Sequence, residues 1–491
     1  MAYWNDSAIW GKLSSRVSAW VGFLQSHLWK ILTGLVILGL ALTRTASIPE
    51  ADTFWQIRSG LDLWESWNFC VPDDYSWTAT GQEYISNSWL WNVLLAGVYA
   101  TAGTMGIAVF TGLCSAVLLT LIALMLRTTG VKWEHIFLST SFSAVFLAEW
   151  LTARPQMADY LLLAAGMLLI SSAVKKGKSR VHLFVILGLI LLVWQNFHLT
   201  GPVGALCFAG FYFMMLMKED GLTTVKVFAS KMGTGLLMLV FLLVVCLATP
   251  YGADGLVKPF VTASASKGLI AEWVSPWDFT EPSNNGSAVG LALILLMVAV
   301  LVWRKEYLPA LFISGLVLIA SDQARWVPFA VILSAVYLCS LLASLPPSKR
   351  KLRPYLKAVA LGVVVAFAGA GSLTFMAGER ASGHYGYTLV ESIPSECRLY
   401  NEQAFGGPVT LLRPDVKVSL DGRNDLYGAT EYFHQVKVSA GKDGSLEWLD
   451  EENVDCVMVH DDRGLNELLD ASHKWEITDE DMNGARLWVR K

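Results

Sequence analysis

The residues best suited to chemistry in this chain are two carboxylates, Glu50 and Asp52, in a polar stretch that follows an apolar segment. A carboxylate in this position can accept a proton from an attacking hydroxyl group or hold a divalent cation, and burial beside lipid would raise its basicity. A capping role is the alternative for Asp52, because Asp is a favoured N-cap and an expected helix runs from it through Trp64. The sequence leaves both roles open.

Three arginines are candidates for binding an anion near these carboxylates. Arg58, Arg154 and Arg325 each lie at the end of an expected helix, and a guanidinium group offers a planar fork that fits phosphate oxygens. Pro155 follows Arg154 and should interrupt helical geometry, which would leave the guanidinium on a fixed corner. The alternatives are that these side chains reach lipid headgroups and, for Arg58, that it pairs with a carboxylate.

One imidazole and one aromatic loop extend this set of candidates. His198 lies at the end of an expected span, where an imidazole can donate to phosphate or move a proton; an ordinary hydrogen-bonding role is the alternative. Glu272 and Trp273 lie in a long loop, 250–287. An aromatic ring beside a carboxylate suits a sugar or a lid over a lipid-linked donor, and an interfacial aromatic belt is the alternative.

Motifs for cofactors are scarce in the sequence. It contains no Walker A, GxGxxG, HExxH or CxxC pattern, so nucleotides, zinc and redox cofactors have no support. A divalent cation, Mg²⁺ or Mn²⁺, remains an open expectation, and its oxygen ligands would come from scattered carboxylates, namely Glu50, Asp52, Asp73 and Glu272. Another charged motif, Asp421-Gly422-Arg423, fits a tight turn in which Arg423 pairs with an acidic neighbour. We expect that motif to be structural or to face the acceptor.

The composition indicates a membrane protein. The chain has 491 residues, of which 54% are hydrophobic and 16% are charged, whereas an ordinary soluble protein is about 25% charged. This excludes a single soluble globular enzyme and a disordered chain. The net charge of −4 gives no support for nucleic-acid binding. The 20 Trp residues fit the aromatic belts of membrane interfaces.

The candidate residues must be held in place by helices, and the sequence contains apolar runs long enough to form helices that cross a bilayer. A helix needs roughly 17–25 apolar residues to span the hydrocarbon, and about eleven runs approach that length. They are 30–46, 104–126, 134–151, 157–174, 181–197, 200–217, 231–249, 288–303, 307–321, 326–345 and 355–376. The apolar segment 89–103 is expected to lie along the interface as a juxtamembrane helix, because all the basic clusters then fall on one side of the membrane.

Lys and Arg accumulate in short cytoplasmic loops, so these clusters also predict the orientation. The N-terminus is expected to be cytosolic, and an odd number of spans places the tail on the other side of the cytoplasmic (inner) membrane. The expected parts are an amphipathic lead-in, 1–29; a transmembrane domain, 30–376, with outer loops 47–103 and 250–287; and an extracytoplasmic domain, 377–491.

The tail is expected to be a small α/β domain. Short apolar runs predict strands, and longer polar stretches with helical periodicity predict helices between Gly, Asp and Asn turns. The expected strands are 409–412, 416–420 and 454–459, and the expected helices are 429–440 and 464–471. Cys70, Cys397 and Cys456 lie on the expected outer side, where one pair among them could oxidise.

The order of several short motifs resembles the GT-C superfamily of membrane glycosyltransferases, which includes oligosaccharyltransferases, protein mannosyltransferases and the lipid A aminoarabinose transferase. The motifs resemble in particular a group of bacterial GT-C-like proteins, and the resemblance spans most of the chain. They are Asp52-Thr-Phe-Trp-Gln-Ile-Arg-Ser-Gly60, Pro72-Asp-Asp-Tyr-Ser-Trp-Thr78, Trp89-Leu90, Ala153-Arg-Pro-Gln156, Asn196-Phe-His198, Pro250-Tyr-Gly252 and the stretch from Leu420 to Gly428.

The resemblance implies a polytopic GT-C-like helical fold and transfer of a sugar from a polyprenyl-phosphate-linked donor to a glycan, lipid or protein acceptor. It implies that Asp52 is the catalytic acidic residue, with Glu50 as a partner. The sequence departs from such relatives at Gln56 and at Asn87-Ser88, where His and His-Glu are common, and it lacks a clear second acidic motif. A transporter or flippase of an anionic or lipid-linked substrate, or an inactive membrane scaffold, remains the alternative.

Overall fold

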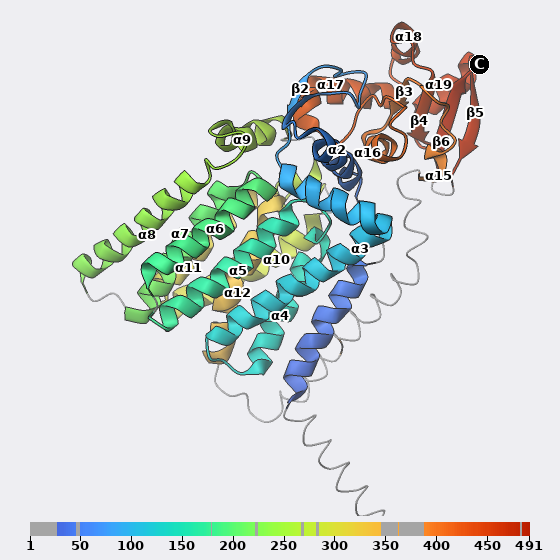
Figure 1. Ribbon diagram of the computed structural model, residues 1–491. Coiled ribbons are helices and arrows are strands. Elements are labelled where there is room, and N and C mark those ends of the chain that lie inside the picture. Colours follow the sequence, from blue (N-terminus) through green and yellow to red (C-terminus); the bar gives the residue numbers. More distant parts are fainter. Residues whose placement is uncertain are drawn as a thin grey trace, which may run out of the picture.

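The computed structural model describes residues 27–45, 50–177, 179–220, 224–266, 270–280, 284–344, 362, 387–481 and 484–491. Most of the expected lead-in, 1–29, and nearly all of the expected span 355–376 lie outside these residues. The described chain forms a helical bundle with a small α/β unit at one end (Figure 1).

The bundle consists of long apolar helices, as the composition predicts. Eight described helices are long and apolar enough to cross a membrane, judged by length and composition. Two shorter helices, α4 (Trp133–Leu147) and α11 (Tyr307–Asp322), lie among them. The eight are His27–Arg44, α3 (Trp89–Thr128), α5 (Gln156–Lys175), α6 (Arg180–Phe197), α7 (Gly201–Asp220), α8 (Val225–Val245), α10 (Asn285–Trp303) and the helix that includes α12 (Val327–Ser344). The protein is therefore a polytopic helical membrane protein.

A kink divides α3 into two parts. Gly103 has φ 60° and ψ −156°, a conformation that only glycine adopts readily. The first part of α3 lies across the end of the bundle beside α2 (Asp52–Ser66), and the second part runs down into the bundle (Figure 1). Residues 89–102 therefore stay at the end of the bundle that carries the α/β unit.

The α/β unit is built on a four-stranded sheet. The strands are in the order β3-β4-β6-β5, with β3 and β4 parallel and the other neighbours antiparallel. The strands are β3 (Leu399–Asn401), β4 (Cys456–His460), β5 (Trp475–Glu480) and β6 (Ala485–Arg490), and the helices are α15 (Tyr387–Val390), α16 (Gln403–Leu412), α17 (Asn424–Ser439), α18 (Ser445–Glu451) and α19 (Leu465–Ser472).

Most of the secondary structure predicted for the tail is confirmed, with two corrections. The predicted strand 454–459 overlaps β4, and the two predicted helices overlap α17 and α19. The predicted strand 409–412 is wrong, because it is the last turn of α16; a short buried apolar run does not distinguish a strand from a helix. The predicted strand 416–420 forms only isolated bridges, between Lys417 and Arg398 and between Val418 and Ser76.

A disulfide bond links two segments of the tail. Cys397 and Cys456 are bonded, with their Cα atoms 6.2 Å apart, and link the segment before β3 to the first residue of β4. Cys70, the third cysteine of the expected group, is a free thiol. One pair among the three cysteines is thus oxidised, which the sequence had left open.

The tail packs directly on the segment that contains α2. Helix α16 lies on α2, and a Cβ atom at Gly407 would come within 2.3 Å of the backbone oxygen of Ala51, so only glycine permits this approach. The hairpin of β1 (Cys70–Pro72) and β2 (Glu83–Ile85) lies beside α17. On the other side, α9 (Asp254–Ser266) runs along α17 (Figure 1). These contacts bring segments that are far apart in sequence to one end of the bundle.

Candidate functional site

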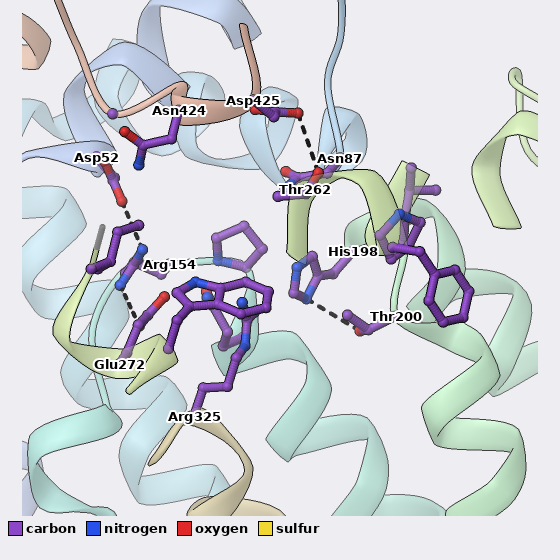
Figure 2. A pocket seen from close by; sticks show the side chains of 18 of the residues that line it. Asp52, Asn87, Arg154, His198, Thr200, Thr262, Glu272, Arg325, Asn424 and Asp425 are labelled. Atoms are coloured by element: carbon purple, nitrogen blue, oxygen red, sulfur yellow. Dashed lines mark hydrogen bonds and ion pairs between the residues drawn. The ribbon is translucent and has the colours of Figure 1, made fainter. Parts of the chain in front are cut away.

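A cavity of about 200 Å³ lies where the end of the bundle, helices α2 and α9, and the tail meet. Figure 2 shows polar side chains converging on it from separate elements. Six of the nine predicted site residues line it: Asp52, Arg154, His198, Glu272, Trp273 and Arg325. The sequence therefore predicted most of the charged groups that this cavity brings together.

Arg154 is the centre of a carboxylate cluster. Its Nη2 donates to Asp52 Oδ2 at 2.7 Å, and its Nη1 donates to Glu272 Oε2 at 2.9 Å. Its Nε lies 3.9 Å from Glu50 Oε2. Pro155 is the N-cap of α5, so Arg154 lies on the corner that the sequence predicted. Its fork is occupied by carboxylates, however, and this argues against the phosphate-binding role expected from the sequence.

Glu50, and not Asp52, caps the start of α2. The carboxylate of Glu50 accepts from the backbone N–H of Asp52 at 3.0 Å and from the hydroxyl of Thr53. Asp52 makes no capping bond to its own helix; its Oδ1 accepts from Trp55 Nε1 at 3.3 Å, and its Oδ2 accepts from Arg154. Asp52 therefore directs both of its oxygens toward the cavity side of α2.

The pKa values of Glu50, Asp52 and Glu272 are shifted in different directions. Burial and the neighbouring Asp52 raise the pKa of Glu50 to about 7. Burial also raises the pKa of Asp52, although Arg154 opposes the shift. Burial acts to raise the pKa of Glu272, but the guanidinium of Arg154, with that of Arg325, outweighs it and lowers that pKa. Asp52 is thus more basic than an ordinary aspartate while Glu272 stays ionised.

Arg325 faces the same cavity, and its guanidinium has no hydrogen-bond partner among the described residues. Its guanidinium stacks on the ring of Trp273, 3.8 Å from the centroid, and lies 5.6 Å from that of Trp326. It lies in a short helical turn, η4 (Ala324–Trp326), and Trp273 ends another, η2 (Ala271–Trp273). No carboxylate in the part of the chain that the structure describes lies within ion-pair distance of Arg325. Its fork is available to an anion.

His198 is held by a buried aspartate that the sequence reasoning missed. Its Nδ1 lies 2.7 Å from Asp159 Oδ2 and 3.2 Å from Thr200 Oγ1. Asp159 is 1% exposed and lies in the first turn of α5. These contacts fix the ring and leave Nε2 on the cavity side (Figure 2). A carboxylate inside an apolar span is costly, so Asp159 carried a signal that could have been used.

The tail supplies one wall of the cavity. Gly422 packs against Asp52, since a Cβ atom there would come within 1.8 Å of Asp52 Oδ1. Asn424 and Asp425 also line the cavity. Asp425 Oδ2 binds Lys258 Nζ at 2.6 Å and Thr262 Oγ1 at 3.2 Å, which fastens α9 to α17. Gly422 belongs to the Asp421-Gly422-Arg423 motif, which was expected to be structural or to face the acceptor, whereas Lys258, Thr262 and Asn424 were not singled out, because only tertiary contacts bring them near Asp52.

Two predicted substrate-binding residues lie outside the cavity. Arg58 pairs with Asp62 at 3.0 Å, one turn further along α2, which is the carboxylate pair considered as its alternative. Asp73 is buried and accepts from Arg423 Nη1 at 2.6 Å. Arg423 also binds Asp421 at 2.6 Å, as the sequence predicted for an acidic neighbour. Arg58 and Asp73 line a separate cavity of about 440 Å³, in which each is bound to a partner of opposite charge.

The described residues do not form a fitting site for a divalent cation. No cluster of three or more His, Cys, Asp or Glu side chains suited to a metal is found among them. The carboxylates that the sequence offered as ligands are bound to arginine: Asp52 and Glu272 to Arg154, and Asp73 to Arg423. We therefore derive no step through a metal.

Comparison with known proteins identifies the fold. No protein-family sequence model and no curated protein sequence matches the chain. Its structure is similar to that of an oligosaccharyltransferase from Archaeoglobus fulgidus, which was solved tethered to an acceptor peptide containing the NVT sequon. The TM-score is 0.52 and the identity 12%, over 89% of this chain and 70% of that one.

A second similar structure is the arabinofuranosyltransferase AftD from mycobacteria, with a TM-score of 0.45 and 13% identity over 94% of this chain and 40% of that one. The first similarity shows that this chain shares the fold of that oligosaccharyltransferase, in agreement with the motifs, which resemble a group that includes oligosaccharyltransferases.

Proposed function

We propose that this protein transfers a sugar from a polyprenyl-phosphate-linked donor to an acceptor on the outer side of the cytoplasmic membrane. The observation that carries this proposal is the cavity, in which a basic carboxylate, Asp52, and an unpaired guanidinium, Arg325, face the same space. Similarity of fold to a GT-C glycosyltransferase supports the reaction class.

Asp52 is the proposed general base. It accepts the proton of the acceptor hydroxyl as that oxygen attacks the anomeric carbon, and Arg154 holds the carboxylate in place at 2.7 Å. Glu272 holds Arg154 from the other side at 2.9 Å. Arg154 and Glu50 are thus positioning residues of the proposed site, and Glu50 also caps the helix that presents Asp52.

Arg325 and His198 are the proposed partners of the donor phosphate. When the bond between the anomeric carbon and the phosphate oxygen breaks, the lipid phosphate leaves with one additional negative charge. A guanidinium without a carboxylate partner and an imidazole fixed at Nδ1 by Asp159 can stabilise that charge. Attack on the face opposite the phosphate would invert the configuration of the sugar.

The orientation is also part of the proposal. Helix α5 begins at the cavity and ends at Lys175, about 30 Å away along its axis, so the basic loop Lys175-Lys176 lies at the other end of the bundle. The disulfide in the tail suits an oxidising compartment. Thiol labelling of single-cysteine variants in intact cells tests this, because a tail that is labelled only after permeabilisation would contradict the proposed orientation.

The decisive experiment for the reaction is transfer of sugar from a polyprenyl-phosphate donor by the purified protein. Asp52→Asn keeps the shape of the side chain and removes the base, so turnover should fall by roughly 10²–10⁴-fold. The matched control is Glu65→Gln, which removes an exposed carboxylate from the same helix and should leave turnover unchanged. Equal activity of Asp52→Asn and wild type would remove Asp52 from the role of base.

A further inference from the structure

Another cavity lies at the opposite end of the bundle. It has a volume of about 420 Å³ and lies between the end of α7, the end of α10, the start of α11 and the end of α12. Helix α7 begins at Gly201, beside the first cavity, and Lys218 lies 17 residues further on, about 25 Å along the helix axis. The two cavities are therefore separate, and we call this one the basal crevice.

The walls of the basal crevice are apolar and adaptable. Three methionines from α7 form one side, and methionine adjusts its shape to irregular apolar partners. The opposite side comes from leucine and valine side chains of α10, α11 and α12. The apolar lining side chains are Met214, Met215, Met217, Leu301, Leu308, Val336 and Leu341. Such walls suit a hydrocarbon chain.

The mouth of the basal crevice carries Lys218, Lys305 and the carboxylate of Glu306. Lys218 and Lys305 both line it and are exposed, and neither has an ion-pair partner among the described residues. The neighbouring Arg304 is already engaged, since its Nε lies 3.3 Å from Glu306 Oε1 and its Nη1 donates to Ser344 Oγ. Two ammonium groups therefore remain available to one anion at the edge of an apolar crevice.

The backbone at Lys305 is part of the end of α10. Lys305 has φ 62°, the left-handed region in which glycine is usual. It follows the C-cap of α10, where the N–H of Glu306 bonds to Leu301 O and the N–H of Lys305 bonds to Val302 O, both at 2.9 Å. A lysine therefore occupies a position that favours glycine. This is the left-handed geometry of a helix end, which Trp67 and His473 also adopt after α2 and α19.

We propose that the basal crevice binds one anionic phospholipid from the adjacent leaflet. The phosphate of the headgroup lies between Lys218 and Lys305, and an acyl chain lies against the methionines of α7. The bound lipid fastens the α10–α11 hairpin to α7 and α12. This proposal does not depend on the glycosyl-transfer reaction.

Thermal unfolding of the full-length protein in detergent tests the proposal. Phosphatidylglycerol in mixed micelles should raise Tm saturably by about 2–4 °C, and phosphatidylcholine with the same acyl chains should not. Glycerol phosphate, which carries the anion without the chains, should have no effect. An equal shift with phosphatidylcholine, or a shift with glycerol phosphate alone, would overturn the proposal.

Three variants separate charge from backbone strain. Lys218→Gln should abolish the phosphatidylglycerol shift, whereas the control Lys226→Gln, which removes an exposed lysine from α8, should retain it. Lys305→Gly should raise Tm without lipid, because it relieves the left-handed lysine, and should still lose the lipid shift. If both Lys218→Gln and Lys305→Gly keep the full shift, the lipid binds elsewhere and the proposal is wrong.

Discussion

Two arginines, Arg154 and Arg423, each donate hydrogen bonds to two carboxylates, yet their surroundings differ. Arg423 binds Asp73 and Asp421 at 2.6 Å each, and these side chains are at most 2% exposed. Arg154 binds Asp52 and Glu272 at 2.7 and 2.9 Å, and its side chain remains 24% exposed on the wall of a cavity. The strength of an ion pair therefore does not identify a functional site, whereas access to a ligand does.

The aromatic rings around the two clusters explain this difference. The rings of Tyr75, Tyr84 and Tyr427 lie 4.7, 5.4 and 5.8 Å from the guanidinium of Arg423 and close it off from solvent. Arg423 thus joins the loop that carries Asp73 to the tail. Beside Arg154, the aromatic face of Trp273 is occupied by Arg325, and space remains between the charged groups. We call the group around Arg423 the closed cluster and the group around Arg154 the open cluster. We expect the closed cluster to govern stability and the open cluster to govern turnover.

The largest expected effect is on turnover at the open cluster. Arg154→Ala removes two charge-assisted bonds of about 1.5–3 kcal/mol each, so sugar transfer should fall by roughly 10²–10⁴-fold. Arg154→Lys keeps the charge without the fork and should be intermediate. Steady-state kinetics would check this, with Arg413→Lys, which alters an ion pair with Asp415 in the tail, as the control. Wild-type turnover in Arg154→Lys would show that the fork is not needed.

The next effect is on stability at the closed cluster. Arg423→Met leaves two buried carboxylates without a cation and should lower the free energy of unfolding by about 3–5 kcal/mol. Urea unfolding of the tail, followed by tryptophan fluorescence, would measure it. Arg398→Gln breaks an exposed pair with Glu452 and should cost at most about 1 kcal/mol. A tail as stable in Arg423→Met as in wild type would contradict the structural role.

A pH effect on stability should come from Glu50 beside the open cluster. Its pKa in the folded protein, about 7, lies above the ordinary value of 4.5, so the folded state binds more protons between these values. Stability should therefore fall as pH rises from about 4.5 to 7, by roughly 1–3 kcal/mol. Glu50→Gln should flatten this part of the profile. Unfolding curves across this range that are the same in the two proteins would argue against a raised pKa.

The smallest expected effect is at Arg58, which belongs to neither cluster. Its pair with Asp62 is partly exposed and spans one helical turn, so Arg58→Gln should lower the free energy of unfolding by about 0.3–0.5 kcal/mol. Turnover should not change, because Arg58 does not line the cavity. A decrease in donor affinity in this variant would restore Arg58 to the binding site and require a larger site than the cavity shows.

The sequence predicts features that are decided by residues close together in the chain. It does not predict contacts between residues that are far apart in the chain. Hydropathy predicts the membrane helices because each span is decided locally by about 20 residues. The positions of Arg154 and Arg325 at helix ends could be predicted for the same reason. Their partners could not be assigned, since nothing local distinguishes a guanidinium that binds Asp52 from one that stacks on Trp273.

The residues that were missed or misplaced depend on tertiary packing. In the sequence, Asp73 and Asp52 look alike, because both are acidic residues of the segment expected to be an outer loop. Only the contact of Asp73 with Arg423, 350 positions away, indicates a structural role for Asp73. Asp159 gave a local signal as a carboxylate at the start of a span, but its partner His198 comes from another helix end. Gly422 gave no signal of its contact with Asp52, because its role is to let the backbone of the tail reach that residue.

The contact between Gly422 and Asp52 has a consequence for the timing of biosynthesis. The two residues are 370 positions apart in the sequence. At about 5–20 residues per second, a ribosome that has added Asp52 needs roughly 20–70 s more to reach Gly422. During that interval helix α2 has been synthesised, but Asp52 lacks the wall that Gly422 later provides. The cavity beside Asp52 is therefore completed only after most of the chain has been made.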